Sequence, residues 1–186
     1  MMKLVTKRLI LRDVFTKDAG DIAENANDKE IGNFTTVPYP YTIKNAKLFV
    51  KKNNSDKKKK PRKEYGFGIT LKGKNRVIGL ISLMKVSNVD KKAEIGYWLG
   101  KKYRKQGVLS EAEKAILNFG FNKLKLNKIY GKALTKNTGS NKLFKKFKFR
   151  KIGLLKEDVI KKGNKKDMYY WELLKSDWIK HKGKLK

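Results

Sequence analysis

The sequence predicts a single mixed α/β domain, and three observations lead to this prediction. The chain has 186 residues, a length that fits one domain with a buried core. Segments with the alternation typical of strands and segments with the spacing typical of helices follow one another along it. No internal repeat or linker divides them, so we take residues 1–186 as one α/β domain.

The N-terminal part predicts one strand and two helices. Residues 4–14 alternate and are rich in β-forming side chains, which indicates a strand. Thr16 is placed to cap a helix that runs to about Asn27, and Thr42 is placed to cap a second one. The like charges of residues 53–63 repel one another, so we expect a mobile loop there; a tethering arm for an acidic partner is the alternative.

From residue 64 onward, the pattern predicts six strands and two helices. The strands are expected at residues 64–71, 76–86, 91–99, 127–134, 150–160 and 165–174. The first helix follows Ser110, because Ala112, Ile116 and Phe119 repeat at helical spacing. The second helix is short and spans Ser140–Phe147.

The charge of the chain is strongly positive. It carries 48 lysine and arginine residues against 17 aspartate and glutamate residues, a net charge of +31. Such a charge attracts polyanions, including nucleic acids, anionic membranes and phosphate-rich cofactors. Only 6 of the 48 basic residues are arginine, which argues against sequence-specific nucleic-acid recognition. Non-specific contact with RNA or the ribosome is a hypothesis, and an AT-rich genome would produce the same lysine excess.

The composition also excludes several kinds of chemistry. Cysteine is absent, and His181 is the single histidine. Disulfides, thiolate zinc sites and cysteine nucleophiles are therefore excluded, and we expect neither a serine–histidine hydrolase nor a metal site. No apolar run is long enough to span a membrane, and the charged N-terminus is unlike a secretory signal. We expect a cytoplasmic protein with no membrane partner.

The stretch YRKQGVLS, residues 103–110, joins a predicted strand to the helix that follows. The first N–H groups of a helix lack partners within it and attract anions, helped by the helix dipole. Gly107 removes a Cβ where a phosphate would approach the backbone, and Arg104 adds positive charge. The loop therefore predicts an anion site, although Ser110 and Glu113 fit a plain capping box equally well.

Four motifs, in the right order, resemble the GNAT N-acetyltransferase superfamily and its ribosomal-protein N-terminal acetyltransferase-like (Rim-type) branch. They are TKRLILR at residues 6–12, EIGYWL at 94–99, RKQGVL at 104–109 and NTGS at 137–140. The resemblance covers nearly the whole chain. It implies a mostly antiparallel, splayed mixed sheet flanked by helices, and an enzyme that transfers an acetyl group from acetyl-CoA to a primary amine.

The resemblance also implies where acetyl-CoA binds. Its pantetheine arm would lie in the splay of the sheet, paired with the backbone of Trp98 and Leu99 like an added strand. Backbone N–H groups of the loop would hold the pyrophosphate, and Asn137 would order its own loop or contact the cofactor. The implied cofactor-binding residues are Trp98, Leu99, Arg104, Lys105, Gln106, Gly107, Val108, Leu109, Ser110 and Asn137.

The implied reaction is a direct transfer that uses no protein nucleophile. It needs a base for the ammonium, donors for the oxyanion and an acid for the departing thiolate. Glu94, on the strand beside the splay, is the candidate base, acting through water; a solvent-facing strand residue is the alternative. Ser140 is the candidate acid by resemblance to this branch, and plain helix capping is its alternative.

The expected acceptor is a protein N-terminal α-amine, on a ribosomal or other RNA-associated protein. A polyamine, an aminoglycoside or an amino acid is the alternative, which the charge of +31 disfavours because it repels cationic acceptors. A non-catalytic nucleic-acid- or ribosome-binding protein on the same scaffold is a further alternative. The sequence gives no prediction of the oligomeric state.

Overall fold

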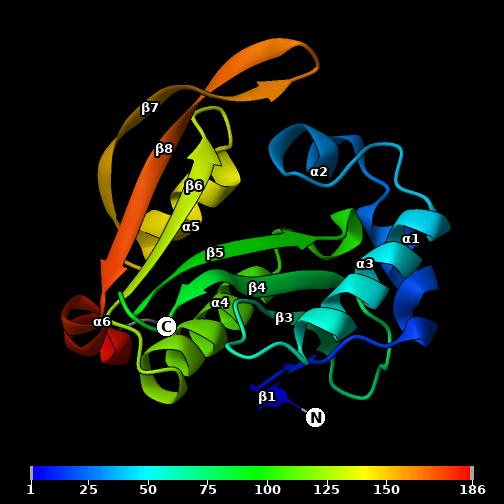
Figure 1. Ribbon diagram of the computed structural model, residues 1–186, viewed down its shortest axis with the longest axis horizontal. Coiled ribbons are helices and arrows are strands. Elements are labelled where there is room, and N and C mark those ends of the chain that lie inside the picture. Colours follow the sequence, from blue (N-terminus) through cyan, green and yellow to red (C-terminus); the bar gives the residue numbers. More distant parts are fainter. Residues whose placement is uncertain (1, 185–186) are drawn as a thin grey trace.

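The computed structural model describes residues 2–184, whose strands form one open, eight-stranded sheet (Figure 1). The strand order is β1-β2-β3-β4-β5-β6-β8-β7, and every neighbouring pair is antiparallel except β5 and β6. The strands are β1 (Lys3–Val5), β2 (Leu9–Arg12), β3 (Tyr65–Leu71), β4 (Gly79–Ser87), β5 (Lys92–Leu99), β6 (Lys128–Leu134), β7 (Arg150–Lys161) and β8 (Asn164–Leu174). The predicted α/β fold with a mostly antiparallel sheet is confirmed.

Helices cover both faces of this sheet. They are α1 (Ala19–Ala26), α2 (Lys29–Phe34), α3 (Ile43–Asp56), α4 (Val108–Asn118), α5 (Thr138–Lys146) and α6 (Lys175–His181). Ile95 and Leu99 of β5 belong to the large core cluster with α4 and α5, whereas Trp98 belongs to a second cluster with α1 and α3. Because neighbouring residues of a strand point to opposite faces, β5 carries one core on each side.

The predicted single strand at residues 4–14 is wrong, because β1 and β2 form a hairpin. The chain turns at Thr6, whose hydroxyl oxygen accepts a hydrogen bond from the Leu9 N–H at 2.9 Å. At the open end of the hairpin, the Met2 N–H donates to the Asp13 carboxylate at 3.0 Å. The alternation that predicted one strand therefore belongs to two strands that fold back on each other.

The first helix begins differently from the prediction. Thr16 lies in a 3₁₀ turn (Thr16–Asp18) ahead of α1 rather than at its cap. Asp18 makes the capping contact instead, because its carboxylate accepts the Phe15 N–H at 2.7 Å and pairs with Arg12 at 2.8 Å. The sequence pattern does not indicate the two short helices α2 and α6.

The predicted start of α3 is confirmed, because the Thr42 hydroxyl accepts the Asn45 N–H at 3.3 Å. The helix continues to Asp56, into the stretch 53–63 that we expected to be a loop. Lys52 pairs with Asp56 at 2.9 Å, and such an i,i+4 pair stabilises a helix. The charges that indicated a loop thus partly neutralise each other on one helical face.

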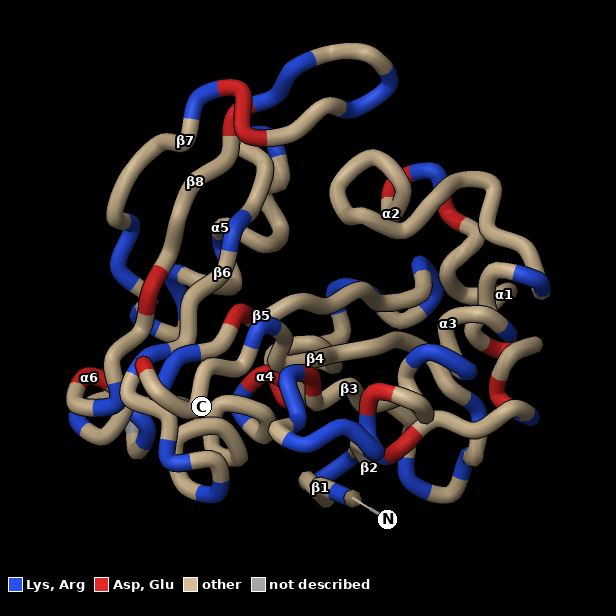
Figure 2. Tube along the Cα trace, viewed as in Figure 1, with Lys and Arg blue, Asp and Glu red and all other residues tan. Residues whose placement is uncertain are grey.

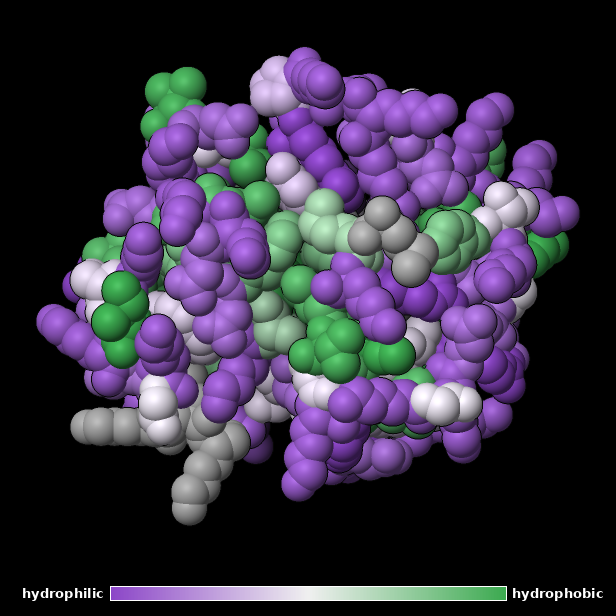
Figure 3. All heavy atoms as spheres, turned by 90° about the horizontal axis from the view of Figure 1, so that it is seen from below, coloured by the Kyte–Doolittle hydropathy of each residue, from purple (hydrophilic) through white to green (hydrophobic). Residues whose placement is uncertain are grey.

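The surface carries lysine and arginine along most of the chain, as the charge-coloured trace shows (Figure 2). The face in Figure 3 is mainly hydrophilic, with an apolar band across its middle. Among residues 2–184, no helix has the length and apolarity that a bilayer crossing requires. The same residues contain no group of three His, Asp or Glu side chains arranged for a metal ion.

Candidate active site

The sheet splays open between β5 and β6. The two strands pair at only three positions, where Lys92 to Glu94 face Lys128 to Tyr130. Beyond Glu94, β5 runs on to Leu99 with β4 as its one strand partner, and β6 diverges from it (Figure 1). The edge of β5 that faces β6 is therefore open to a ligand that pairs like an added strand.

The basic loop, by which we mean residues 104–110, leads from this open edge into α4. Gly107 is the N-cap of α4 and has a φ of 73°, and Lys105 has a φ of 61°. The first helical hydrogen bond runs from the Glu111 N–H to the Gly107 carbonyl at 3.0 Å. The N–H groups of residues 108–110 thus precede the helical ladder, in a turn of the kind that binds anions.

The alternative of a capping box from Ser110 to Glu113 is wrong. α4 begins at Val108, three residues earlier than a cap at Ser110 would place its start. Gly107 is the cap instead, in the left-handed conformation that glycine tolerates best. Ser110 therefore lies in the first turn of α4, and its N–H points with those of its neighbours toward the N-terminal end.

Glu111 fixes the basic loop to the N-terminal hairpin. Its carboxylate accepts hydrogen bonds from the Thr6 hydroxyl (2.6 Å), the Arg8 N–H (2.7 Å) and the Arg8 Nε (2.6 Å). Arg8 also donates through Nη1 to the Gln106 carbonyl at 3.0 Å. Burial raises the pKa of Glu111, but these hydrogen bonds lower it more, so that the pKa falls on balance.

Arg104 connects the basic loop to α2. Its guanidinium contacts the carboxylates of Asp28 at 2.6 Å and Glu30 at 2.5 Å, and its Nε donates to the Leu99 carbonyl at 3.0 Å. We expected Arg104 to add free positive charge to the loop. The two carboxylates neutralise that charge, so Arg104 acts here as a structural link. The Leu99 carbonyl is likewise already hydrogen-bonded.

A polar cluster lies beside the splay, formed by half-buried Tyr97 of β5, buried Glu113 of α4 and half-buried Ser140 of α5. Burial raises the pKa of Tyr97 well above its usual value, the charge of Glu113 adds to this, and the Ser140 hydroxyl opposes it. The Tyr97 and Ser140 hydroxyls are neighbours, although the Tyr97 oxygen forms no hydrogen bond of good geometry within residues 2–184. The predicted alternative that Ser140 caps α5 is wrong, because Asn137 is the cap and accepts the Ser140 N–H at 3.1 Å.

Glu113 is the residue of this region that the sequence interpretation missed. Its side chain is 0% exposed, and neither carboxyl oxygen has a hydrogen-bond partner within residues 2–184. Burial raises its pKa well above the usual value, against an opposing effect of Lys146, because burial disfavours the charged form. One signal was available: Glu113 stands one helical turn before Leu117, which is fully buried.

Glu94 is the last residue of β5 that pairs with β6, and its side chain lies on the sheet face opposite Tyr97. Its side chain is 15% exposed and its Oε2 lies 2.8 Å from the Lys85 ammonium. Its role as base stays a prediction, and so does the alternative of a solvent-facing strand residue. Glu94 raises the pKa of Lys85 through their hydrogen bond, and the carboxylate is held at the base of the splay.

A second wall lies beside the splay and includes α2, the helix to which Arg104 links the basic loop. We call it the hairpin wall: α2 together with the hairpin of β7 and β8, whose tip approaches α2 in Figure 1. Lys161 joins its two parts, because its ammonium donates to the backbone carbonyls of Gly32 (3.2 Å) and Thr35. Glu94 lies at the base of the splay, where β5 and β6 part.

The geometry combines a broken parallel strand pair with an N–H-lined helix start, and comparison with known proteins agrees with it. A family model described as an acetyltransferase (GNAT) domain matches residues 8–150. The chain belongs to the GNAT acetyltransferase family. Its predicted family and enzyme class are confirmed, and as a GNAT N-acetyltransferase it uses acetyl-CoA as acetyl donor.

Relatives of this GNAT chain cover nearly its full length. It is 31% identical over 179 residues to the uncharacterized N-acetyltransferase p20 of Bacillus licheniformis. This match spans 96% of this chain and 99% of that protein. It is 31% identical over 83 residues, 45% of this chain and 46% of the relative, to a ribosomal-protein-serine acetyltransferase of Escherichia coli strain K12. The crystal structure of a GNAT-family acetyltransferase from Bacillus anthracis is 27% identical, with a TM-score of 0.81, over 94% of this chain and 99% of that one.

Proposed function

We propose that this GNAT enzyme acetylates the N-terminal α-amine of a protein, on a ribosomal or other RNA-associated target in the cytoplasm. The observation that carries the chemistry is the open edge of β5, which ends at the bare N–H groups of α4. The name of the Escherichia coli relative, a ribosomal-protein-serine acetyltransferase, supports this class of acceptor. The net charge of +31 supports a target surrounded by RNA.

Three features of the chain fit acetyl-CoA. The β5 edge beside Trp98 and Leu99 offers backbone groups to the pantetheine arm. The N–H groups of the basic loop suit a pyrophosphate, and Gly107 has no Cβ to obstruct it. The residues proposed to bind acetyl-CoA are Trp98, Leu99, Lys105, Gln106, Gly107, Val108, Leu109 and Ser110, with Arg104 and Asn137 as ordering residues.

Acetyl-CoA supplies the acetyl group as a thioester that an amine attacks directly. Glu94, where β5 and β6 part, is the proposed general base that removes the amine proton through water. Ser140 is the proposed donor to the sulfur, with the neutral Tyr97 hydroxyl beside it. Changing Glu94 to Gln should lower the plateau of kcat at high pH while leaving the affinity for acetyl-CoA unchanged. An unchanged plateau would remove Glu94 from the mechanism.

An α-amine suits this site better than a lysine side chain. An α-amine has a pKa of about 7.7–8, so a useful fraction is neutral at physiological pH, whereas a lysine at about 10.4 is almost fully charged. A weak base such as Glu94, which already neighbours the Lys85 ammonium at 2.8 Å, can serve the first far better than the second.

The test is to offer acetyl-CoA together with peptides, polyamines, aminoglycosides and intact ribosomal subunits, and to locate the acetyl group by mass spectrometry. Each peptide is supplied with a free and with a blocked α-amine. We expect transfer to free α-amines and to ribosomal proteins. Transfer mainly to a polyamine or a sugar amine would overturn the proposal, and acetyl-CoA binding without any transfer would favour a non-catalytic scaffold.

A further inference from the structure

A cavity of about 430 Å³ opens along the hairpin wall, between α2, the end of β6 and the tip of the β7–β8 hairpin. Four lysines line it, Lys136, Lys161, Lys162 and Lys166, and the one carboxylate in its lining is Asp167. The trace in Figure 2 shows basic segments at the tip of the β7–β8 hairpin. The cavity therefore offers an excess of positive charge at the end of β6.

Some lysines at the hairpin and on the neighbouring β6 have carboxylate partners, whereas others have none. Lys132 pairs with Asp158 at 3.0 Å, and Lys165 pairs with Glu157 at 2.6 Å. Asp167 accepts the Glu157 N–H at 2.9 Å. The carboxylates of the hairpin are thus already engaged with groups of the hairpin and of β6.

The cavity lysines have no such neutralising partners. Within residues 2–184, the ammonium groups of Lys136, Lys162 and Lys166 form no ion pair with a carboxylate. Lys161 uses its own ammonium to bind the two carbonyls of α2, and burial lowers its pKa. Lys161 therefore holds the wall together, while the other three cations face an open cavity and favour an anionic ligand.

The distance between the cavity and Glu94 determines how long a ligand must be to reach both. Tyr130 faces Glu94 at the base of the splay, and β6 extends four residues further to Leu134, where the cavity begins. At about 3.3 Å per strand residue, this separation is about 13 Å. A single molecule that places an amine at Glu94 and a negative charge at the cavity must therefore be at least four extended residues long.

We propose that the acceptor is an acidic peptide segment: a protein N-terminus whose third to sixth residues include aspartate or glutamate. The α-amine lies at Glu94, and the carboxylates of the segment contact Lys136, Lys162 and Lys166 along the hairpin wall. Phe34 and Leu134, which also line the cavity, contact the apolar parts of the segment. The inference rests on the proposed function and specifies its substrate class.

The experiment measures kcat/KM for a set of eight-residue peptides with free α-amines. The peptides differ only at positions 3–6, which are acidic, neutral or basic. We expect the acidic peptide to exceed the basic one by at least tenfold at low salt, and the ratio to shrink as salt screens the charges. Equal values for the three peptides would overturn this proposal but leave the proposed function intact. No transfer to any peptide would instead overturn the proposed function.

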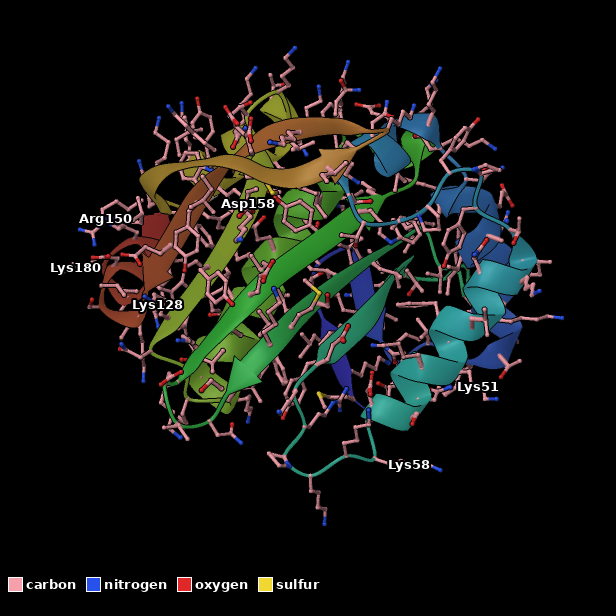
Figure 4. The ribbon with its side chains drawn as sticks, turned by 45° about the horizontal axis from the view of Figure 1, so that its top comes forward. Lys51, Lys58, Lys128, Arg150, Asp158 and Lys180 are labelled. Carbon is pink, nitrogen blue, oxygen red and sulfur yellow. The ribbon has the colours of Figure 1, made fainter. Side chains whose placement is uncertain are left out.

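Two variants of equal charge change locate the effect. Lys162→Glu/Lys166→Glu changes the cavity, and Lys51→Glu/Lys58→Glu changes α3 and the loop after it, where both lysines point outward far from the hairpin (Figure 4). We expect the first variant alone to lose or reverse the preference, with an unchanged Kd for acetyl-CoA by calorimetry. The proposal fails if both variants behave alike, if the Kd for acetyl-CoA rises, or if only binding of an RNA oligonucleotide is lost.

Discussion

The basic loop and the β7–β8 hairpin both contact α2, and charged contacts hold them in very different ways. Three carboxylates, those of Glu111, Asp28 and Glu30, fix the loop through two arginines. Within the hairpin wall, the β7–β8 hairpin is joined to α2 through the ammonium of Lys161. The loop side is thus held rigidly, and the hairpin side is left cationic and adaptable.

This contrast has a compositional reason. The chain has 17 acidic residues for 48 basic ones, so few lysines can be paired. Two of the six arginines, Arg8 and Arg104, are at the loop, where a planar guanidinium binds carboxylates and carbonyls in fixed directions. A group that must hold a cofactor in one position gains from such geometry, whereas a surface that attracts a mobile peptide does not need it.

Changing Glu111 to Ala should have the largest effect on this comparison. It leaves the donors of Thr6 and Arg8 without their shared acceptor, and we expect a loss of about 3 kcal/mol in the free energy of unfolding. The Kd for acetyl-CoA should rise at least tenfold, because the loop loses its anchor. Urea unfolding and calorimetry measure the two effects.

The control for this variant is Glu24→Gln, which removes an exposed pairing with Arg76. We expect a change within about 0.5 kcal/mol, because exposed ion pairs contribute little. If the two variants were equally stable and bound acetyl-CoA equally well, the loop would not depend on its carboxylate anchor.

Changing Glu113 to Leu should stabilise the protein, because it removes a buried carboxyl without partners. We expect a gain of about 2 kcal/mol in the free energy of unfolding. The sign of the pH effect follows from the raised pKa: the folded carboxyl keeps a proton that the unfolded one has released. The stability of the wild type should therefore fall as pH rises above about 4.5, by up to about 1.4 kcal/mol per pH unit.

Urea unfolding at pH 5 and pH 8 checks this prediction, with Glu113→Gln as a neutral variant of nearly the same shape. Both variants should lack the part of the pH slope that Glu113 causes. A less stable leucine variant with the wild-type slope would show that Glu113 is charged and compensated in the folded state.

Changing Lys161 to Met should have the smallest effect, confined to the hairpin wall. The apolar stem is kept and the ammonium that binds the Gly32 and Thr35 carbonyls is lost. We expect a loss of less than about 1 kcal/mol in stability and a severalfold rise in KM for the peptide, with an unchanged Kd for acetyl-CoA. Lys165→Met, which breaks an exposed pair with Glu157, is the matched control and should leave KM unchanged. An equal rise in both variants would contradict the role of Lys161 as the link.

The middle of the chain was predictable because its signals are local. The strands of residues 64–99 alternate strongly, and the glycine of the basic loop stands where the helix begins. The N-terminal hairpin was not predictable, because its turn is fixed by Glu111, about a hundred residues away. The same holds for α2, a six-residue helix that Arg104 and Lys161 hold from distant elements.

Within the site, the wrong predictions came from locating helix starts only from side chains that can cap a helix. Ser110 and Glu113 fit a capping box in sequence, and Ser140 fits a cap equally well. In the structure, Gly107 and Asn137 occupy those positions, each three residues earlier. That shift moves Glu113 from a cap into the core, which only the packing of α4 against β5 and α5 reveals.

The central claim is that the backbone of the basic loop binds acetyl-CoA, and calorimetric titration of Gly107→Trp tests it most directly. The matched control is Gly73→Trp, because Gly73 has a φ of 75° against 73° for Gly107 and no atom within 4 Å of its Cβ position. Backbone strain is therefore similar in the two variants, and only one of them obstructs the loop. We predict one acetyl-CoA site per chain in the wild type and in Gly73→Trp, and no measurable binding in Gly107→Trp. Undiminished binding in Gly107→Trp would contradict the account.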